Sequence, residues 1–124
     1  MNKLSYPVVL TIILLSGCTT IGSIEGNYAK INYSNGINRT KAVLIAKHDL
    51  IQTDLKYYYN IIHPEVVQLS NNDWRVTFYE KGFFHLFPES YVIYIKKNGA
   101  IYQRCKCLGL PLFGDPCHCE PAKY

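Results

Sequence analysis

Four of the five cysteines lie within fifteen residues near the C-terminal end, where they form the pairs Cys-Lys-Cys and Cys-His-Cys. They are Cys105, Cys107, Cys117 and Cys119. Two chemistries use cysteines that lie so close together, namely two disulfide bonds or one zinc ion held by four thiolates. Zinc sites commonly use Cys-x-x-Cys spacing, so the spacing here disfavours zinc without excluding it. A redox-active role is disfavoured because the Cys-x-x-Cys pattern of that chemistry is absent.

The sequence shows no catalytic constellation. The histidines are scattered along the chain, at His48, His63, His85 and His118. His48 and Asp49 are neighbours on a predicted helix, where adjacent residues point to different faces. The motifs of serine hydrolases, zinc proteases and phosphate-binding loops are all absent. We therefore expect a protein that is not an enzyme and that carries no cofactor, with no catalytic residues and no metal ligands beyond the zinc alternative above.

The fifth cysteine, Cys18, follows a segment that has the features of a targeting signal. Lys3 supplies a positive charge, residues 7–15 form a short apolar run, and small residues precede the cysteine. The apolar run is about half as long as a membrane-spanning helix requires. Residues 1–17 are therefore predicted to be a signal peptide.

The tetrapeptide Leu15-Ser16-Gly17-Cys18 resembles the lipobox of bacterial lipoproteins. In that class the signal peptide is cut before the cysteine, which then receives acyl chains, palmitate among them, that anchor the protein in a membrane. The resemblance implies lipidation of Cys18 and a location in the cell envelope. Thr19, where an Asp would retain a lipoprotein in the inner membrane, favours the outer membrane, facing the periplasm. The alternative is an ordinary signal peptide that a cysteine follows by chance.

An oxidising envelope compartment favours disulfides for the C-terminal cysteines. If the two Cys-x-Cys pairs are the arms of a hairpin, both cysteines of an arm point to the same face, because strand side chains alternate. The register then pairs Cys105 with Cys119 and Cys107 with Cys117. Residues 108–116, which contain two glycines and two prolines, suit the closing loop. A four-cysteine zinc site remains the alternative.

The chain that would remain after signal cleavage suits one domain with a modest core. Residues 18–27 are small and polar and predict a tether, and residues 28–124 predict a single α+β domain. Loss of Lys3 would lower the formal net charge from +4 to +3. The remaining basic residues are scattered, so binding to nucleic acid is not expected.

The predicted domain has one helix and about four strands. Asn38 and Thr40 are candidate N-caps of the helix, whose apolar residues recur at helical spacing between Ala42 and Leu50. Residues 54–60 fit no single element. Strands are predicted at residues 66–69, 74–80, 91–97 and 100–107, with residues 22–33 a candidate further strand.

The dipeptide Asn98-Gly99 predicts a two-residue hairpin turn, because both positions tolerate positive φ. Such a turn pairs Ile95 with Tyr102 and Ile93 with Arg104. The predicted fold class is α+β, with one N-terminal helix packed on an antiparallel sheet of about four strands and a C-terminal hairpin stapled by cysteines.

The order of elements over residues 38–104 resembles small cystatin-like domains, found in PepSY modules and in nuclear-transport-factor-two-like immunity proteins of toxin systems. The shared features are an Ala-containing helix, a strand that begins at Trp74, and a strand pair around Asn98-Gly99-Ala100-Ile101. The resemblance implies an immunity protein that neutralises a toxin or effector in the periplasm. The chain departs from the pattern at Tyr57-Tyr58-Tyr59 and in its cysteine cluster.

Aromatic residues between two predicted strands mark a candidate binding surface for a protein partner. Residues 81–91 carry Phe83, Phe84 and Phe87 where polar loop residues are expected. Three consecutive tyrosines cannot all face one core, so Tyr58 or a neighbour should be exposed. Burial of the phenylalanines beneath the helix is the alternative. We expect a protein-binding module of the envelope; the alternatives are an assembly lipoprotein of a secretion or conjugation apparatus, or a lysozyme inhibitor.

Overall fold

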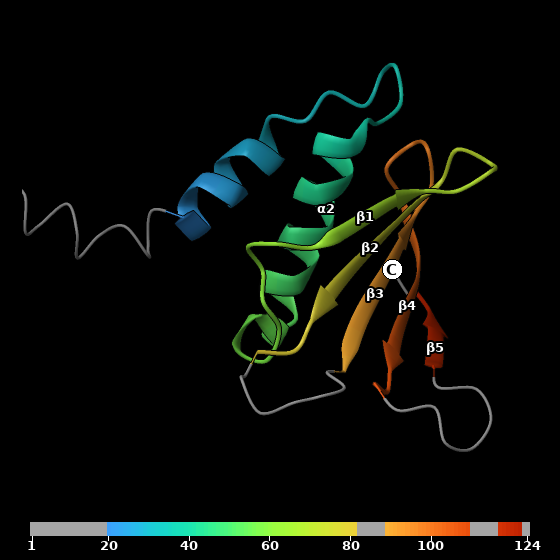
Figure 1. The fold of residues 1–124 in the computed structure, drawn as a ribbon. Coiled ribbons are helices and arrows are strands. Elements are labelled where there is room, and N and C mark those ends of the chain that lie inside the picture. The colour runs from blue at the N-terminus through green and yellow to red at the C-terminus, as the bar shows by residue number, and fades with distance from the viewer. Residues whose placement is uncertain (1–19, 82–88, 110–116, 123–124) are drawn as a thin grey trace, which may run out of the picture.

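The computed structural model describes residues 20–81, 89–109 and 117–122, and these residues form an α+β fold (Figure 1). Five antiparallel strands lie side by side in their chain order, β1-β2-β3-β4-β5. Their bounds are β1 Glu65–Gln68, β2 Trp74–Tyr79, β3 Ser90–Ile95, β4 Ile101–Cys107 and β5 Cys117–Pro121. The predicted strands are therefore present, and the second arm of the cysteine hairpin is a fifth strand of the same sheet.

The helix α2, Arg39–Gln52, covers one face of the sheet and packs on β1 and β2. The Asn38 side chain accepts a hydrogen bond from the Lys41 amide, which confirms Asn38 as the N-cap. The predicted apolar stripe is also confirmed at its centre, where Ala42, Ala46 and Leu50 are fully buried. This stripe meets the inward side chains of the sheet to form the core.

A second helix occupies residues 20–29, where the sequence predicted a tether followed by a candidate strand. Both expectations are wrong over these residues. Ile24 and Tyr28, which lie one turn apart on the helix, turn inward, since Ile24 is buried and Tyr28 packs against the core. Figure 1 shows this helix beside α2, on the side away from the sheet. The chain therefore becomes helical within two residues of Cys18.

The hairpin between β3 and β4 differs from the predicted two-residue turn. The Lys96 amide donates to the Ala100 carbonyl, so three residues form the loop, and Gly99 adopts a φ of +97°. The pair Ile93–Arg104 forms as predicted, but Ile95 pairs with Ile101 instead of Tyr102. The register shift between Tyr94 and Ile95 accommodates the extra residue. A three-residue loop that ends on a glycine with positive φ commonly produces such a bulge.

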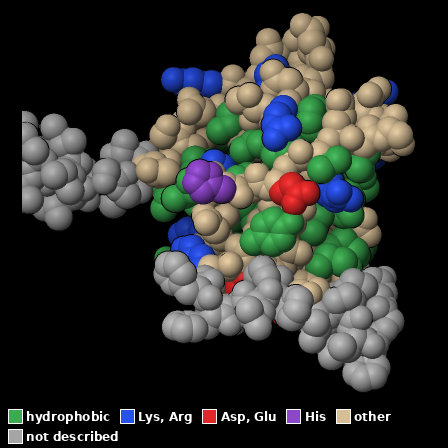
Figure 2. All heavy atoms as spheres, in the orientation of Figure 1, with side chains coloured by type: hydrophobic (Ala, Val, Ile, Leu, Met, Phe, Trp, Pro, Cys, Tyr) green, Lys and Arg blue, Asp and Glu red, His purple; other side chains and the backbone are tan. Residues whose placement is uncertain are grey.

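The two faces of the sheet carry different side chains, because neighbours along a strand alternate. Toward α2 point large apolar residues that are nearly inaccessible, among them Val76, Phe78, Ile93 and Ile95. The opposite face carries Tyr79 and both cysteine pairs. Figure 2, which has the orientation of Figure 1 and so shows the molecule from the side, shows hydrophobic side chains interrupted by basic, acidic and histidine side chains. No described helix covers this face (Figure 1).

Residues 54–60, which the sequence left unassigned, contain a short 3-10 helix at Leu55–Tyr57. Tyr59 then turns into the core at 3% exposure, whereas Tyr57 and Tyr58 remain 69% and 66% exposed. The prediction that the three tyrosines cannot all be buried is confirmed. The Asn60 amide donates to the Tyr79 carbonyl and so fastens this segment to the end of β2.

Candidate functional site

Two disulfides join β4 to β5 in the predicted pairing. Cys105 bonds to Cys119 and Cys107 bonds to Cys117, and the Cα atoms of each pair are 4.0 Å apart. The strand register places the same residues opposite one another. So short a separation is typical of the antiparallel positions that exchange no backbone hydrogen bonds with each other. The disulfides therefore staple positions where the backbone ladder between the strands contributes nothing.

A bidentate ion pair links α2 to β4. Arg104 donates from Nε to Oδ2 of Asp49 at 2.9 Å and from Nη2 to Oδ1 at 2.6 Å. Asp49 is only 8% exposed, so this carboxylate is buried beside a guanidinium that satisfies both of its oxygens. Arg104 takes the sheet position opposite Ile93, where an apolar residue would otherwise face the helix. The pair thus connects α2 to β4, in addition to the packing of the helix on β1 and β2.

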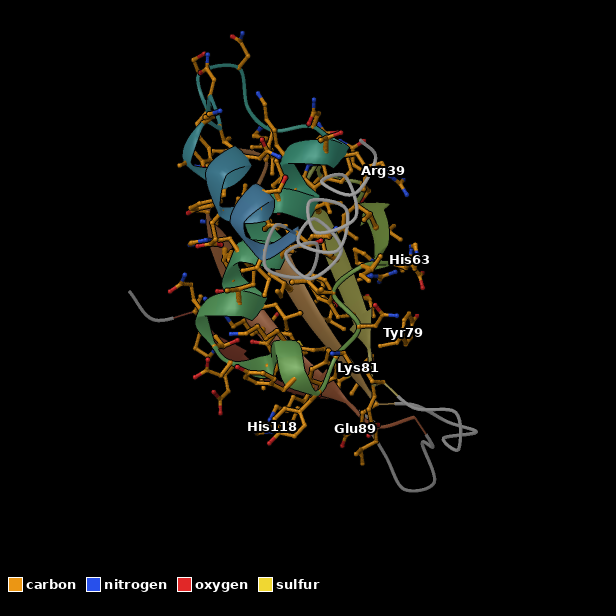
Figure 3. The ribbon with its side chains drawn as sticks, turned by 90° about the vertical axis from the view of Figure 1, so that its left-hand side faces the viewer. Arg39, His63, Tyr79, Lys81, Glu89 and His118 are labelled. Atoms are coloured by element: carbon orange, nitrogen blue, oxygen red, sulfur yellow. A yellow bond between two sulfur atoms is a disulfide. The ribbon has the colours of Figure 1, made fainter. Side chains whose placement is uncertain are left out.

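A hollow of about 290 Å³ opens beside this ion pair. Its lining includes Tyr91, Arg104, Lys106, His118 and Glu120, which come from β3, β4 and β5. His118 Nε2 lies 3.7 Å from Glu120 Oε1, and both side chains are largely exposed. Figure 3 shows His118 at the lower end of the molecule. The hollow is charged but mixed in sign, and it contains no nucleophile beside a base.

Tyr91 has the most strongly shifted phenol in the described structure. Burial, with a smaller contribution from the nearby Asp49 carboxylate, raises the pKa of Tyr91 to about 12, although Arg104 opposes the shift. Its phenol therefore stays protonated at every physiological pH. It can donate a hydrogen bond but cannot serve as a base near neutrality.

His48 and Asp49, adjacent in sequence, point in different directions as predicted. His48 Nδ1 lies 2.7 Å from Glu25 Oε1, and its ring stacks on Tyr28 with the centroids 3.7 Å apart. Gln52 donates to the other Glu25 oxygen at 3.2 Å. These contacts, which we call the Glu25–His48 clasp, attach the helix at residues 20–29 to α2. The histidine is thus used to join two helices.

The tyrosine segment lies beside both ends of the stretch that contains the phenylalanines. The Lys81 amide donates to the Tyr58 carbonyl at 2.9 Å, and the Glu80 amide donates to the Glu89 carbonyl at 2.9 Å. Figure 3 shows Lys81 and Glu89 near one another at the lower end of the molecule. Phe83, Phe84 and Phe87 themselves lie outside the described residues, as does Cys18. Of the predicted partner-binding residues, the structure therefore places only Tyr58, whose side chain is exposed.

Over residues 20–81, 89–109 and 117–122, no group of three or more His, Cys, Asp or Glu side chains could hold a metal ion. The four C-terminal cysteines form two disulfides, so the structure has the disulfide pairs and not the four-thiolate zinc site that the sequence left as the alternative. None of the helices in the described part of the chain combines the length and hydrophobicity needed to cross a bilayer.

Comparison with known proteins gives no relatives. The sequence matches no protein-family model and no curated protein, and neither sequence nor fold yields a significant match among solved structures. Any function must therefore be argued from the residues themselves.

The sequence did not reveal the Asp49–Arg104 pair or the Glu25–His48 clasp. The first joins residues 55 positions apart and the second joins residues 23 apart. One signal was present, because Asp49 falls on the apolar stripe of α2, three and four residues after Ala46 and Ile45. A charged residue at such a position needs a buried partner of opposite charge.

Proposed function

We propose that this chain is a lipid-anchored protein of the bacterial cell envelope that acts by binding another protein. The lipobox-like Leu15-Ser16-Gly17-Cys18 motivates the anchor. The two disulfides support an oxidising compartment, because such bonds persist in the periplasm and are rare in the cytosol. The partner is an envelope or secreted protein, and the scattered basic residues argue against nucleic acid.

The observation that carries the binding role is a pair of exposed tyrosines, Tyr57 and Tyr58, of which Tyr58 is hydrogen-bonded to Lys81 at one end of the phenylalanine-containing stretch. Tyr57 and Tyr58 expose about two thirds of their surface, although tyrosine has a large apolar ring. Aromatic side chains that are exposed in the free protein often become the anchors of an interface. We assign the recognition surface to Tyr58 together with Phe83, Phe84 and Phe87.

The more specific version of this proposal is an immunity protein that neutralises a periplasmic toxin or effector. It rests on the resemblance of residues 38–104 to cystatin-like immunity domains. An assembly lipoprotein of a secretion or conjugation apparatus and a lysozyme inhibitor are the alternatives. A lytic assay separates the lysozyme inhibitor from the other two, and loss of secretion or conjugation in a deletion strain identifies the assembly role.

Chemical cross-linking of the lipidated protein in intact envelopes, and in envelopes exposed to secretions of competing bacteria, tests the binding role. We expect one protein to be cross-linked by the wild type and lost with Tyr58→Ser. The matched control is Tyr33→Ser, an exposed tyrosine beside the β3–β4 hairpin tip. An immunity role further requires that the captured protein be toxic and that the wild type relieve this toxicity.

Two results would contradict the proposal. A protein retained equally by Tyr58→Ser and by Phe83→Ser/Phe87→Ser would move recognition away from the assigned surface. Recovery of a small ligand and no protein partner would exclude a protein-binding role.

A further inference from the structure

We infer that the surface around Thr20, Ile21, Lys47 and Ile62 lies against the lipid headgroups of the membrane. We call it the anchor-side surface. The inference rests on the proposed acylation of Cys18 and goes beyond it, because an anchor alone does not fix which face of the domain meets the bilayer.

The first step is the reach of the chain between the anchor and the fold. Only one residue separates Cys18 from Thr20, the first residue of the helix at residues 20–29. Consecutive Cα atoms are about 3.8 Å apart, so the Cα atoms of Cys18 and Thr20 are separated by at most about 7.6 Å. If the acyl chains of Cys18 are inserted in a bilayer, Thr20 lies within about one and a half helix turns of the residue that carries them.

The second step is the attachment of this helix to the rest of the domain. The Glu25–His48 clasp, which includes the stacking of Tyr28 on His48, holds the helix against α2. Ile24, on the same helix, is buried. Thr19 is therefore the one residue of the sequence between the proposed anchor and a helix that is attached to the core. The part of the core next to Thr20 must approach the membrane together with Thr20.

The third step is the chemistry of that part of the molecule. A hollow of about 330 Å³ is lined by Thr20, Ser23, Ile24, Lys47, Ile61 and Ile62. The Ile62 side chain is 60% exposed, which is unfavourable in water and favourable in the interfacial region of a bilayer. Ile21 is 37% exposed and continues the inward stripe of Ile24 by one turn toward Cys18.

Lys47 supplies the cation that such a surface needs beside anionic lipids. It lies half-buried along the hollow, where burial lowers its pKa from the ordinary value. Its apolar stem can lie along the isoleucines while the ammonium group reaches the phosphates. Negative lipid headgroups would favour the charged form and so oppose the effect of burial.

The strands β4 and β5 lie away from this surface. In Figure 1 the helix at residues 20–29 and the strand β5 lie at opposite sides of the molecule. Leu108, directly after β4, is 61% exposed and thus matches Ile62 in size, polarity and exposure. It provides a control at a position that the inference places off the membrane.

The experiment uses the full chain, expressed with its own leader and purified in detergent. Mass spectrometry first establishes whether Cys18 is acylated. Ile62→Trp and Leu108→Trp proteins are then reconstituted into vesicles of phosphatidylethanolamine and phosphatidylglycerol with acyl chains brominated close to the headgroups. Trp74 is buried in the core, so wild-type fluorescence gives the background to subtract.

We expect quenching and a blue shift of the Ile62→Trp emission, with Leu108→Trp unaffected. A flexible Gly-Ser spacer of about eight residues inserted before Thr20 should abolish the quenching while leaving acylation intact. Ile21→Trp replaces Ile62→Trp if circular dichroism shows that the latter fails to fold.

The outcomes separate the inference from the proposal on which it rests. Acylated protein in which neither tryptophan is quenched, or in which Leu108→Trp is quenched as much as Ile62→Trp, overturns the anchor-side surface and leaves the anchor standing. Protein that is cleaved or retained without acylation overturns both.

Discussion

At the residue scale, the buried charge of Asp49 decides how α2 meets the sheet. The carboxylate receives two hydrogen bonds from Arg104, so neither oxygen is left without a donor. A buried pair of this kind gains little over a well-packed apolar pair, but removing one partner leaves a charge in a poor solvent. The cost of mutation should therefore depend on which partners are removed together.

Asp49→Asn should lower the free energy of unfolding by about 2–3 kcal/mol, because it leaves the guanidinium of Arg104 partly buried without its counter-charge. Urea denaturation measures the change. The double variant Asp49→Leu/Arg104→Met should cost less than the two single changes together. Glu120→Gln, which removes the exposed ion pair with His118, is the control and should shift stability by no more than about 0.5 kcal/mol. Equal effects of Asp49→Asn and Glu120→Gln would contradict this account.

Tyr91 should make the fold sensitive to alkali. Its pKa is about 12 in the folded state and about 10 in an unfolded chain. Because the folded pKa is raised, the neutral phenol contributes stability that is fully present below pH of about 10 and is lost as pH rises through about 12. Tyr91→Phe should therefore flatten the fall in unfolding free energy across this window, as measured by urea titrations at a series of pH values. Tyr58→Phe should leave the fall unchanged, and a wild-type slope in Tyr91→Phe would refute the assignment.

At the element scale, the predictions made from the sequence agree with the structure where a feature depends only on residues close together in the chain. The alternation of β2 and β3, the Asn38 cap and the register of the cysteine strands all depend on neighbours along the chain, so they could be predicted. The helix at residues 20–29 could not, because Gly22 and Gly26 lower helix propensity and its stability comes from docking on α2. The same holds for the candidate binding residues. The sequence could predict that at least one of the three tyrosines is exposed. It could not predict the hydrogen bond from Lys81 to Tyr58, which depends on tertiary structure.

Two glycines give opposite expectations for the same substitution. Nothing lies within 4 Å of a Cβ added at Gly26, so Gly26→Ala should raise helix stability by about 0.5–1 kcal/mol. A Cβ at Gly99 would lie 2.6 Å from the Tyr33 ring at a φ of +97°, so Gly99→Ala should cost about 1–2 kcal/mol. Thermal unfolding of both variants beside wild type tests the pair. A stabilising Gly99→Ala would show that the hairpin tip adopts another conformation in solution.

At the scale of the whole molecule, β5 depends on covalent bonds more than the other strands do. Four of its five residues are exposed, so packing contributes little to its attachment. The disulfides span 14 and 10 residues and each should contribute about 3 kcal/mol. The two disulfides therefore hold β5, which lacks an apolar face, at the edge of the sheet.

Replacing Cys105 and Cys119 by alanine should destabilise the protein more than replacing Cys107 and Cys117. Cys105 is almost fully buried, so its loss also leaves a cavity, whereas Cys107 is only partly covered. Urea denaturation of the two paired variants, with and without reductant, measures the difference. Wild type under reducing conditions should be less stable than either variant under oxidising conditions. The reverse order of the two variants would show that burial of Cys105 contributes nothing.

The chain order of the strands also has a consequence for folding kinetics. Each strand after β1 pairs with the strand before it, so most sheet contacts have low contact order. Each hairpin can therefore close as soon as its second strand is available. The cysteines lie in the last two strands, after β1 to β3 have set the position of β4. The growing sheet can therefore align Cys105 with Cys119 and Cys107 with Cys117 before any thiol is oxidised. Oxidative refolding of the reduced chain should yield these two bridges with little scrambling among the four cysteines.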